Sequence, residues 1–252
     1  MTAKIVQIAR YPVKGFSPQP LDSVDVTAGT VLPYDRRYAI AHAASKFDMA
    51  QPSWLRKAHF LQLMRYAKLA TLTTDFDPET HGFTINRDGK QVAKGALNQN
   101  IGRKLIEQFL NAYLDGEAPV PVKVIEVADQ AMTDQERAVV SLINLASLRD
   151  MERLTRKPVD WRRFRGNLMI DGGPAWQEFD WVGSEINIGP VRGRVVDRID
   201  RCAATTVNPD TGERDMATVQ LLKSGYDHID CGVFIELTND GTVTVGDEVS
   251  AV

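Results

Sequence analysis

Short runs of alternating polar and apolar residues fill the first third of the chain, and this is the pattern of half-buried strands. The runs cover residues 4–8, 23–26, 37–40 and 70–74. A longer stretch, residues 83–92, has Asp88-Gly89 between two such runs, and both residues tolerate the positive φ angles of a tight hairpin turn. The pattern predicts a small antiparallel barrel or sandwich.

Apolar residues at helical spacing interrupt these strands twice, over residues 55–67 and 101–114. We expect Asn100 to cap the second helix. The segment that follows, residues 115–121, is rich in proline and acidic residues and is the best candidate for a domain boundary. The predicted domains are residues 1–118 and 119–252.

The second half of the chain is again rich in strand patterns. The predicted strands are residues 122–127, 167–170, 185–188 and 191–196. Helices are expected at residues 147–156 and 217–223. A closing hairpin should join residues 233–237 to 242–245 through Asn239-Asp240-Gly241. The fold class that follows is mainly β with some helices (α+β), with an N-terminal β-barrel domain followed by a second β-barrel domain.

Composition narrows the class of protein. The chain has 252 residues, 43% hydrophobic and 25% charged, with a formal net charge of -3, as in ordinary globular proteins. The absence of a long basic run argues against nucleic acid as a partner. No stretch has the roughly 20 apolar residues that span a bilayer, and residues 1–10 lack the apolar core of a signal peptide. We therefore expect a cytoplasmic protein with no membrane partner.

The two cysteines, Cys202 and Cys231, are too few for a disulfide framework or an ordinary iron–sulfur cluster. Nucleophile-elbow, Walker, dinucleotide-binding and paired-histidine zinc motifs are also missing. Arg201 precedes Cys202, and a neighbouring guanidinium favours the thiolate. Composition alone favours the blander alternative of a buried, inert cysteine, and Cys231, just before a predicted strand, fits that alternative well.

Five segments together resemble the MOSC family, which includes the mitochondrial amidoxime-reducing component and its bacterial relatives. The segments, in family order, are residues 11–15 (YPVKG), 35–36 (DR), 163–167 (RFRGN), 201–212 (RCAATTVNPDTG) and 241–247 (GTVTVGD). They span nearly the whole chain. The resemblance implies an N-terminal β-barrel domain joined to a MOSC β-barrel domain, with a molybdenum cofactor (Mo-molybdopterin) bound between them.

The resemblance also implies roles for single residues. Cys202 is the expected metal ligand and catalytic residue, since a thiolate is a soft ligand suited to molybdenum. The expected cofactor-binding residues are Lys14, Gly15, Arg36, Ser141, Arg165, Asn167, Arg201 and Thr206. Gly15 stands where relatives often have serine, and Gly166 replaces a usual proline, which we expect to loosen that loop.

Some of these residues have alternative roles. Lys14 or Arg36 taken alone would more often be a solvated surface charge, and Arg201 could pair with a nearby aspartate. Thr206 could hydrogen-bond near the metal or only hold the turn at residues 208–210. Ser141 lies in a stretch, residues 139–144, that resembles a bacterial variant of a cofactor-contacting segment.

By resemblance, the expected function is a molybdenum-dependent oxidoreductase that reduces small N-oxygenated or N-hydroxylated compounds. The chain ends shortly after the last expected strand, so electrons should come from a separate ferredoxin, flavoprotein or b-type cytochrome. An alternative is a carrier of the molybdenum cofactor, or of sulfur for it, without turnover of a small molecule. Pyridoxal phosphate binding is named only as a label of the family. The label comes from molybdenum cofactor sulfurases, whose pyridoxal-phosphate desulfurase portion is absent here. A β-rich binding module with an incidental cysteine is the third option.

Overall fold

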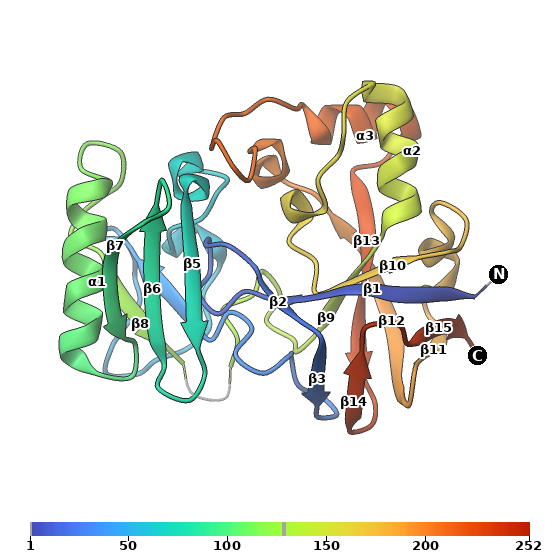
Figure 1. Cartoon of the computed structure of the whole chain (residues 1–252), viewed down its shortest axis with the longest axis horizontal. Coiled ribbons are helices and arrows are strands. Elements are labelled where there is room, and N and C mark those ends of the chain that lie inside the picture. Colours follow the sequence, from blue (N-terminus) through green and yellow to red (C-terminus); the bar gives the residue numbers. More distant parts are fainter. Residues whose placement is uncertain (1, 128–129) are drawn as a thin grey trace.

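The computed structural model describes residues 2–127 and 130–252, and over these the chain is mainly β with three α-helices (Figure 1). The helices are α1 (Asn100–Tyr113), α2 (Leu145–Thr155) and α3 (Thr218–Tyr226). Five short 3₁₀ helices are η1 (Lys57–His59), η2 (Ala67–Thr71), η3 (Trp161–Phe164), η4 (Gln177–Trp181) and η5 (Ala203–Thr206). The predicted mainly-β class with a few helices is confirmed.

The strands lie along almost the whole described chain. They are β1 (Ala3–Arg10), β2 (Gln19–Leu21), β3 (Ser23–Val26), β4 (Tyr38–Ala41), β5 (Leu72–Asp77), β6 (Gly82–Arg87), β7 (Lys90–Ala96), β8 (Lys123–Glu126), β9 (Val140–Asn144), β10 (Leu168–Asp171), β11 (Glu185–Ile188), β12 (Val191–Asp200), β13 (Asp230–Leu237), β14 (Gly241–Thr244) and β15 (Glu248–Ala251).

Seven of these strands form a closed β-barrel. Hydrogen-bonded neighbours follow the order β10, β9, β13, β12, β11, β15 and β1, and β1 also pairs with β10, which closes the ring. The β9–β10 pair is parallel and the other pairs are antiparallel. Because the ring is closed, these strands leave no long unpaired edge.

Every second side chain along the strands points into the barrel and fills it. In β12, Val191 and Val195 are buried, whereas Arg192 and Arg194 face solvent. Removing an aliphatic side chain of this kind from water contributes roughly 1.5–3 kcal/mol. The buried core continues through Ile5, Ile8, Leu142, Leu168, Ile170, Ile186, Val233 and Ile235.

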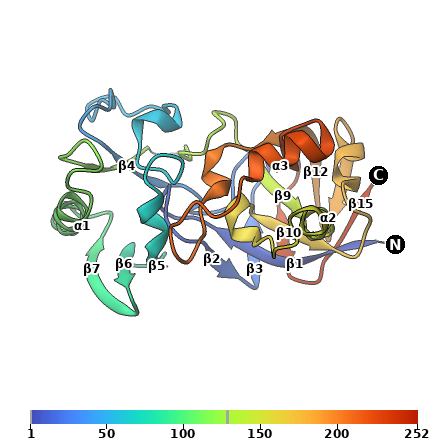
Figure 2. The ribbon, with the colours of Figure 1, turned by 90° about the horizontal axis from the view of Figure 1, so that it is seen from above.

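A smaller unit, made of an antiparallel sheet and a helix, lies at the other end of the molecule from the barrel (Figures 1 and 2). The meander β5–β6–β7 packs against α1, whose residues Ile106 and Leu110 are fully buried with Phe83 of β6. The predicted Asp88-Gly89 turn joins β6 to β7, and both residues have positive φ. Asn100 does not cap α1, because the helix already includes it and Gln99 holds the cap position without a side-chain bond.

In the described residues, the strands of the first half form small separate sheets rather than a second closed barrel. β4 pairs with β8, and β5, β6 and β7 form their own sheet. Between β4 and β5, residues 42–71 contribute two 3₁₀ helices and no strand, so nothing links the two sheets through hydrogen-bonded strands. The boundary at residues 118 and 119 stays a prediction, although β1 and β3 pair with strands of the second half.

Two predicted elements are wrong. Residues 55–67 do not form the predicted amphipathic helix. Only the short 3₁₀ helix η1 lies there ahead of η2, and after η1 the backbone pairs elsewhere: Leu61 N–H donates to the carbonyl of Ile40 at 2.8 Å, and Phe60 bridges Ala41. The predicted closing hairpin is also absent, since β14 pairs with β3 and not with β13. The long-range pairing brings the buried side chains of Val24 and Val243 together.

Candidate functional site

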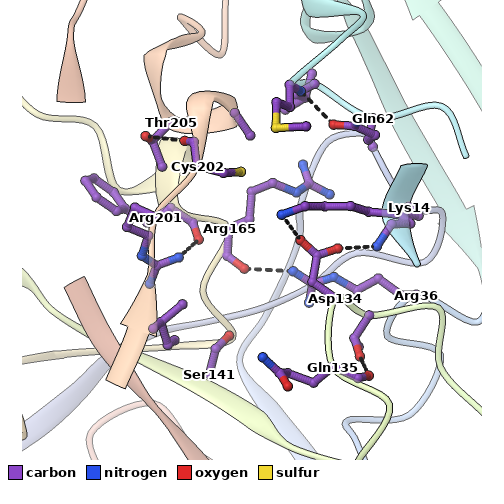
Figure 3. A pocket seen from close by; sticks show the side chains of 18 of the residues that line it. Lys14, Arg36, Gln62, Asp134, Gln135, Ser141, Arg165, Arg201, Cys202 and Thr205 are labelled. Carbon is purple, nitrogen blue, oxygen red and sulfur yellow. Dashed lines mark hydrogen bonds and ion pairs between the residues drawn. The ribbon is translucent and has the colours of Figure 1, made fainter. Parts of the chain in front are cut away.

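A cavity of about 530 Å³ lies between residues of the first half and residues of the barrel. Every sequence-predicted site residue except Thr206 lines it: Lys14, Gly15, Arg36, Ser141, Arg165, Asn167, Arg201 and Cys202. Figure 3 shows most of these side chains around one open space. Segments far apart in the sequence therefore meet at the place that the motifs indicated.

Cys202 follows the end of β12 and precedes η5. Its backbone carbonyl accepts hydrogen bonds from the backbone N–H and the hydroxyl of Thr205, at 3.1 and 2.9 Å. Thr205 is buried and lines the cavity, while Cys202 itself is partly exposed there. The turn thus fixes the backbone and leaves the thiol side chain to the cavity.

The ammonium of Lys14 is buried and lies against a carboxylate. It donates to the carbonyl of Met132 at 2.8 Å and to Asp134 Oδ1 at 2.5 Å. Burial lowers the pKa of Lys14, and Asp134 opposes that change. Lys57 Nζ lies 3.1 Å from the other oxygen, Asp134 Oδ2. Burial would raise the pKa of Asp134, but the two lysines outweigh burial and hold that pKa well below its usual range.

Lys57 also connects this ion cluster to the thiol. Burial would lower the pKa of Lys57, but Asp134 and the hydrogen-bonded Cys202 thiol outweigh it, and the pKa rises. Lys57 therefore stays a cation beside Cys202.

Two guanidinium groups lie over the ring of Tyr11. The Cζ atoms of Arg36 and Arg165 are 4.2 and 4.3 Å from the ring centroid, within the range of cation–π contacts. Arg36 pairs with Asp35 and donates to the carbonyl of Arg165 at 2.8 Å, while Arg165 donates to the carbonyl of Phe16 at 2.7 Å. Burial, and then the nearby Arg36, lower the pKa of Arg165 to about 10.

The guanidinium of Arg201 binds backbone rather than side chains. It donates to the carbonyl of Cys231 through Nε, at 2.7 Å, and through Nη2, and to the carbonyl of Phe164 at 2.8 Å. These bonds tie the start of β13 and the end of η3 to the Cys202 turn. A contact between Arg201 and a cofactor stays a prediction.

Ser141 and Asn167 bind each other at the base of the cavity. The Ser141 hydroxyl and backbone N–H both donate to Asn167 Oδ1, at 2.8 and 3.1 Å, and the Asn167 backbone N–H donates back to the hydroxyl. Asn167 Nδ2 donates to the carbonyl of Ala9 in β1. The pair therefore connects β9, the entrance to β10, and β1.

The two glycines that depart from the family pattern are required by packing. A Cβ on Gly15, which has φ +89°, would lie 2.8 Å from the carbonyl oxygen of Leu61. A Cβ on Gly166 would lie 2.4 Å from a side-chain carbon of Ile143. Gly166 thus allows close packing against Ile143, and the expectation that it loosens its loop stays a prediction.

Thr206 does not line the cavity. Its hydroxyl donates to the carbonyl of Ala203 at 2.8 Å and accepts from Arg214 Nη1 at 2.8 Å. These contacts join Thr206 to η5 and to Arg214 and not to the turn at residues 208–210, so that alternative stays a prediction.

Several residues that line the cavity could not be identified from sequence patterns. Lys57 and Gln62 lie in the segment interpreted as a helix, and Asp134 lies in a loop without hydrophobic periodicity. The pairing of residues 60–61 with β4 could have indicated them, but the local sequence does not reveal this pairing.

Within residues 2–127 and 130–252, no helix is both long enough and apolar enough to cross a bilayer.

Comparisons with known proteins place the second half of the chain in a family. Residues 129–250 match the family model of the MOSC domain. The human "Mitochondrial amidoxime-reducing component 1" is 32% identical over 122 residues, which cover 43% of this chain and 35% of that relative. The "Molybdenum cofactor sulfurase" of Drosophila ananassae is 30% identical over 129 residues, 48% of this chain and 16% of that relative.

The match to these curated relatives thus spans about a third of their length or less. Among solved structures, the YuaD protein from Bacillus subtilis aligns with 99% of this chain and 94% of its own, at 13% identity and a TM-score of 0.45. From the family match and the curated relatives, residues 129–250 form a MOSC domain, and this part of the chain is homologous to the mitochondrial amidoxime-reducing components.

Proposed function

We propose that the chain binds a molybdenum cofactor in the cavity, with Cys202 as the protein ligand to molybdenum. The observation that carries this proposal is the partly exposed Cys202 thiol in a cavity that also contains Lys14, Arg36 and Arg165. A soft thiolate and several cations suit a ligand that has both a soft metal and an anionic phosphate. The names of the relatives, which refer to amidoxime reduction and molybdenum cofactor sulfuration, support the same ligand.

The residues present fit such a group. The cavity volume of about 530 Å³ falls within the roughly 300–1,000 Å³ of small-molecule sites. Among the described residues, two buried donors that line it, Gln62 Nε2 and Arg163 Nε, have no hydrogen-bond partner, so the cavity is prepared for a polar ligand. The same described part has no group of three His, Cys, Asp or Glu side chains that could hold a metal. The dithiolene sulfurs of the pterin would be the other sulfur ligands of the molybdenum, beside the single protein thiolate.

When bound, the cofactor would supply two-electron redox chemistry that side chains lack. Lys14, Arg36 and Arg165 would hold its phosphate and pterin through charge-assisted hydrogen bonds. The Lys14 ammonium already binds Asp134, so an anion at that position would compete with the Asp134 carboxylate. Ser141, Asn167 and Arg201 would keep the strands and the Cys202 turn in position, and Gly15 would offer its backbone N–H.

The proposed reaction is the reduction of an N-hydroxylated compound, in which R–NH–OH, two electrons and two protons give R–NH₂ and water. A separate ferredoxin, flavoprotein or b-type cytochrome would provide the electrons. The task of the protein is to orient the substrate beside the metal and to tune the metal through its thiolate ligand.

Metal and pterin content tests the cofactor assignment. The chain is purified from a host that makes molybdenum cofactor, as wild type and as Cys202→Ser and Cys231→Ser. Burial raises the pKa of the Cys231 thiol to about 12, so this side chain stays a neutral thiol and is the matched control. We expect close to one molybdenum and one pterin per wild-type and Cys231→Ser chain, and at least a tenfold loss of molybdenum in Cys202→Ser.

Activity then tests the reaction. The loaded protein is given benzamidoxime and a chemical reductant, and benzamidine formation is measured. Loaded protein without turnover would favour the carrier alternative, for which the similarity to molybdenum cofactor sulfurases speaks. Wild-type protein without molybdenum, or equal metal loss in the two cysteine variants, would overturn the assignment of Cys202.

A further inference from the structure

Gln62 lines the cavity and has a buried amide group whose donor has no hydrogen-bond partner among the described residues. The residue is 6% exposed and lines the cavity. Its Oε1 accepts a hydrogen bond from the backbone N–H of Met64 at 2.9 Å. Its Nε2 has no hydrogen-bond partner among residues 2–127 and 130–252. An unsatisfied buried donor destabilises the fold, so such a group calls for a partner from outside the chain.

The orientation of this amide is fixed by its surroundings. The Met64 N–H can only donate, so the amide oxygen must face it and the NH₂ group must face away. The backbone of Gln62 is also hydrogen-bonded, because its carbonyl accepts from the N–H groups of Arg65 and Tyr66 at 3.1 and 3.0 Å. The donor of Gln62 is therefore attached to a backbone position that is held by hydrogen bonds, as a binding site requires.

The environment of Gln62 differs from that of the cationic residues. Ala58, Leu63 and Met64, all near Gln62 in sequence, line the same cavity and add an apolar wall. Figure 3 shows Gln62 across the open space from Cys202. A phosphate would be matched by Lys14 and the arginines, whereas a neutral amide donor on an apolar wall suits a neutral oxygen atom of an organic molecule.

We infer that Gln62 is a specificity-determining residue, whose Nε2 donates a hydrogen bond to the N–O oxygen of a bound amidoxime or hydroxylamine. The organic body of that substrate packs on Leu63 and Met64. This inference rests on the proposed function, because it assumes that an N-hydroxylated compound enters the cavity. It adds the residue that distinguishes the oxygenated substrate from its reduced product.

Equilibrium binding tests this role without turnover. Calorimetry measures the dissociation constants of benzamidoxime and benzamidine on molybdenum-loaded protein without an electron donor. Benzamidine lacks the oxygen and is a cation at neutral pH, whereas benzamidoxime is neutral. Two variants remove the donor: Gln62→Glu keeps an acceptor for the Met64 N–H, and Gln62→Met is neutral. Gln177→Met is the matched control, because Gln177 Nε2 is also buried without a partner in the described part of the chain but does not line the cavity.

We expect both Gln62 variants to bind benzamidoxime roughly 5- to 15-fold more weakly, the effect of one neutral hydrogen bond. Molybdenum content should stay at the wild-type level in both variants, and benzamidine binding should stay at the wild-type level in the neutral Gln62→Met. Gln177→Met should match wild type for both compounds. Thermal unfolding of each variant shows that it is folded.

Several results would overturn the inference while leaving the proposed function standing. Unchanged benzamidoxime binding would do so, as would equal weakening for both compounds. Weakening in Gln62→Met alone would assign the effect to the lost Met64 contact. Loss of molybdenum in both Gln62 variants would mean that the amide binds the cofactor. Wild-type protein without molybdenum would instead reject the proposed function itself, and the inference with it.

Discussion

At the scale of single residues, the cavity differs from the rest of the interior in how its polar groups are satisfied. The Arg201 guanidinium donates hydrogen bonds to two backbone carbonyls and so stabilises the fold. Arg36 and Arg165 instead share the face of Tyr11, and each adds positive charge next to the other. Close like charges raise the energy of the empty site. An anionic ligand would remove that cost, so these two arginines should contribute to binding more than Arg201 does.

Glu178 is a buried carboxyl group outside the cavity and should make stability depend on pH. It accepts hydrogen bonds from Asn144 Nδ2 and from the Ser147 hydroxyl. Burial is the main reason that the pKa of Glu178 is raised, and nearby Asp180 adds to it. An unfolded glutamate ionises at about pH 4.3. Above that pH the unfolded chain releases its proton first, so the free energy of unfolding falls as the pH rises towards the folded pKa.

We expect Glu178→Gln to lack this loss, so its thermal midpoint should gain on wild type as the pH rises from about 4 to 7. Each kcal/mol of difference corresponds to roughly 2–4 °C for a chain of this size. Scanning calorimetry over this pH range measures it, with the exposed Glu79→Gln as control. A difference between variant and wild type that does not change with pH would contradict the prediction.

At the scale of elements, the sequence predicts the parts of the site that are contiguous. The Cys202 turn and the segment at residues 163–167 form local motifs, and both line the cavity as expected. Lys57 and Gln62 could not be predicted, since periodicity indicated one amphipathic helix where the chain forms the short 3₁₀ helix η1 and then pairs with β4 at Phe60. Tertiary pairing overrides local preference in such segments. Asp134 depends on a loop whose position is set by Lys14, and no local pattern encodes that contact.

Arg214 connects the Cys202 turn to the facing loop. Its Nη1 donates to the carbonyl of Ala203, and its Nη2 donates to the carbonyls of Leu63 and Met64, at 2.9, 3.2 and 2.7 Å. We expect Arg214→Ala to loosen the turn and to make Cys202 react about fivefold faster with iodoacetamide, since one net hydrogen bond is worth about 1 kcal/mol.

Alkylation is measured by mass spectrometry in a Cys231→Ser background, so that Cys202 is the thiol that reacts. Arg214→Lys should give an intermediate rate, because lysine lacks the planar fork that binds several carbonyls. Arg192→Ala, at an exposed position of β12, is the control. If the Arg214→Ala rate equals that of the control, the turn is held without the arginine.

At the scale of the whole molecule, strand patterns predict which residues are extended but not which strands pair. The alternation in β1 and β3 was visible in the sequence, yet their partners are β10 and β14, from the far end of the chain. Loop closure over such distances is decided by the summed burial of the core, not by local preference. The sequence therefore predicted that the second half forms a β-barrel, but it did not predict that the N-terminal strand β1 is part of that barrel.

Because β1 closes the barrel, a core substitution in the first ten residues should destabilise strands more than 130 residues away. Ile5 is 1% exposed in the barrel core and pairs with Ile170. Ile5→Ala should cost about 2–5 kcal/mol in the free energy of unfolding by urea. Its neighbour Val6, 41% exposed on the same strand, is the matched control, and Val6→Ala should cost about 0.5 kcal/mol or less.

Hydrogen exchange locates the effect. Amides of β9, β10, β12 and β13 should lose protection together in Ile5→Ala, because the closed ring shares one core and opens as one unit. Loss confined to residues 2–26 would contradict this, and would mean that the remaining six strands hold the barrel without β1. The Cys202 turn follows β12 directly, so an Ile5→Ala protein with a weakened barrel should also retain less molybdenum, which connects the first strand to the proposed site.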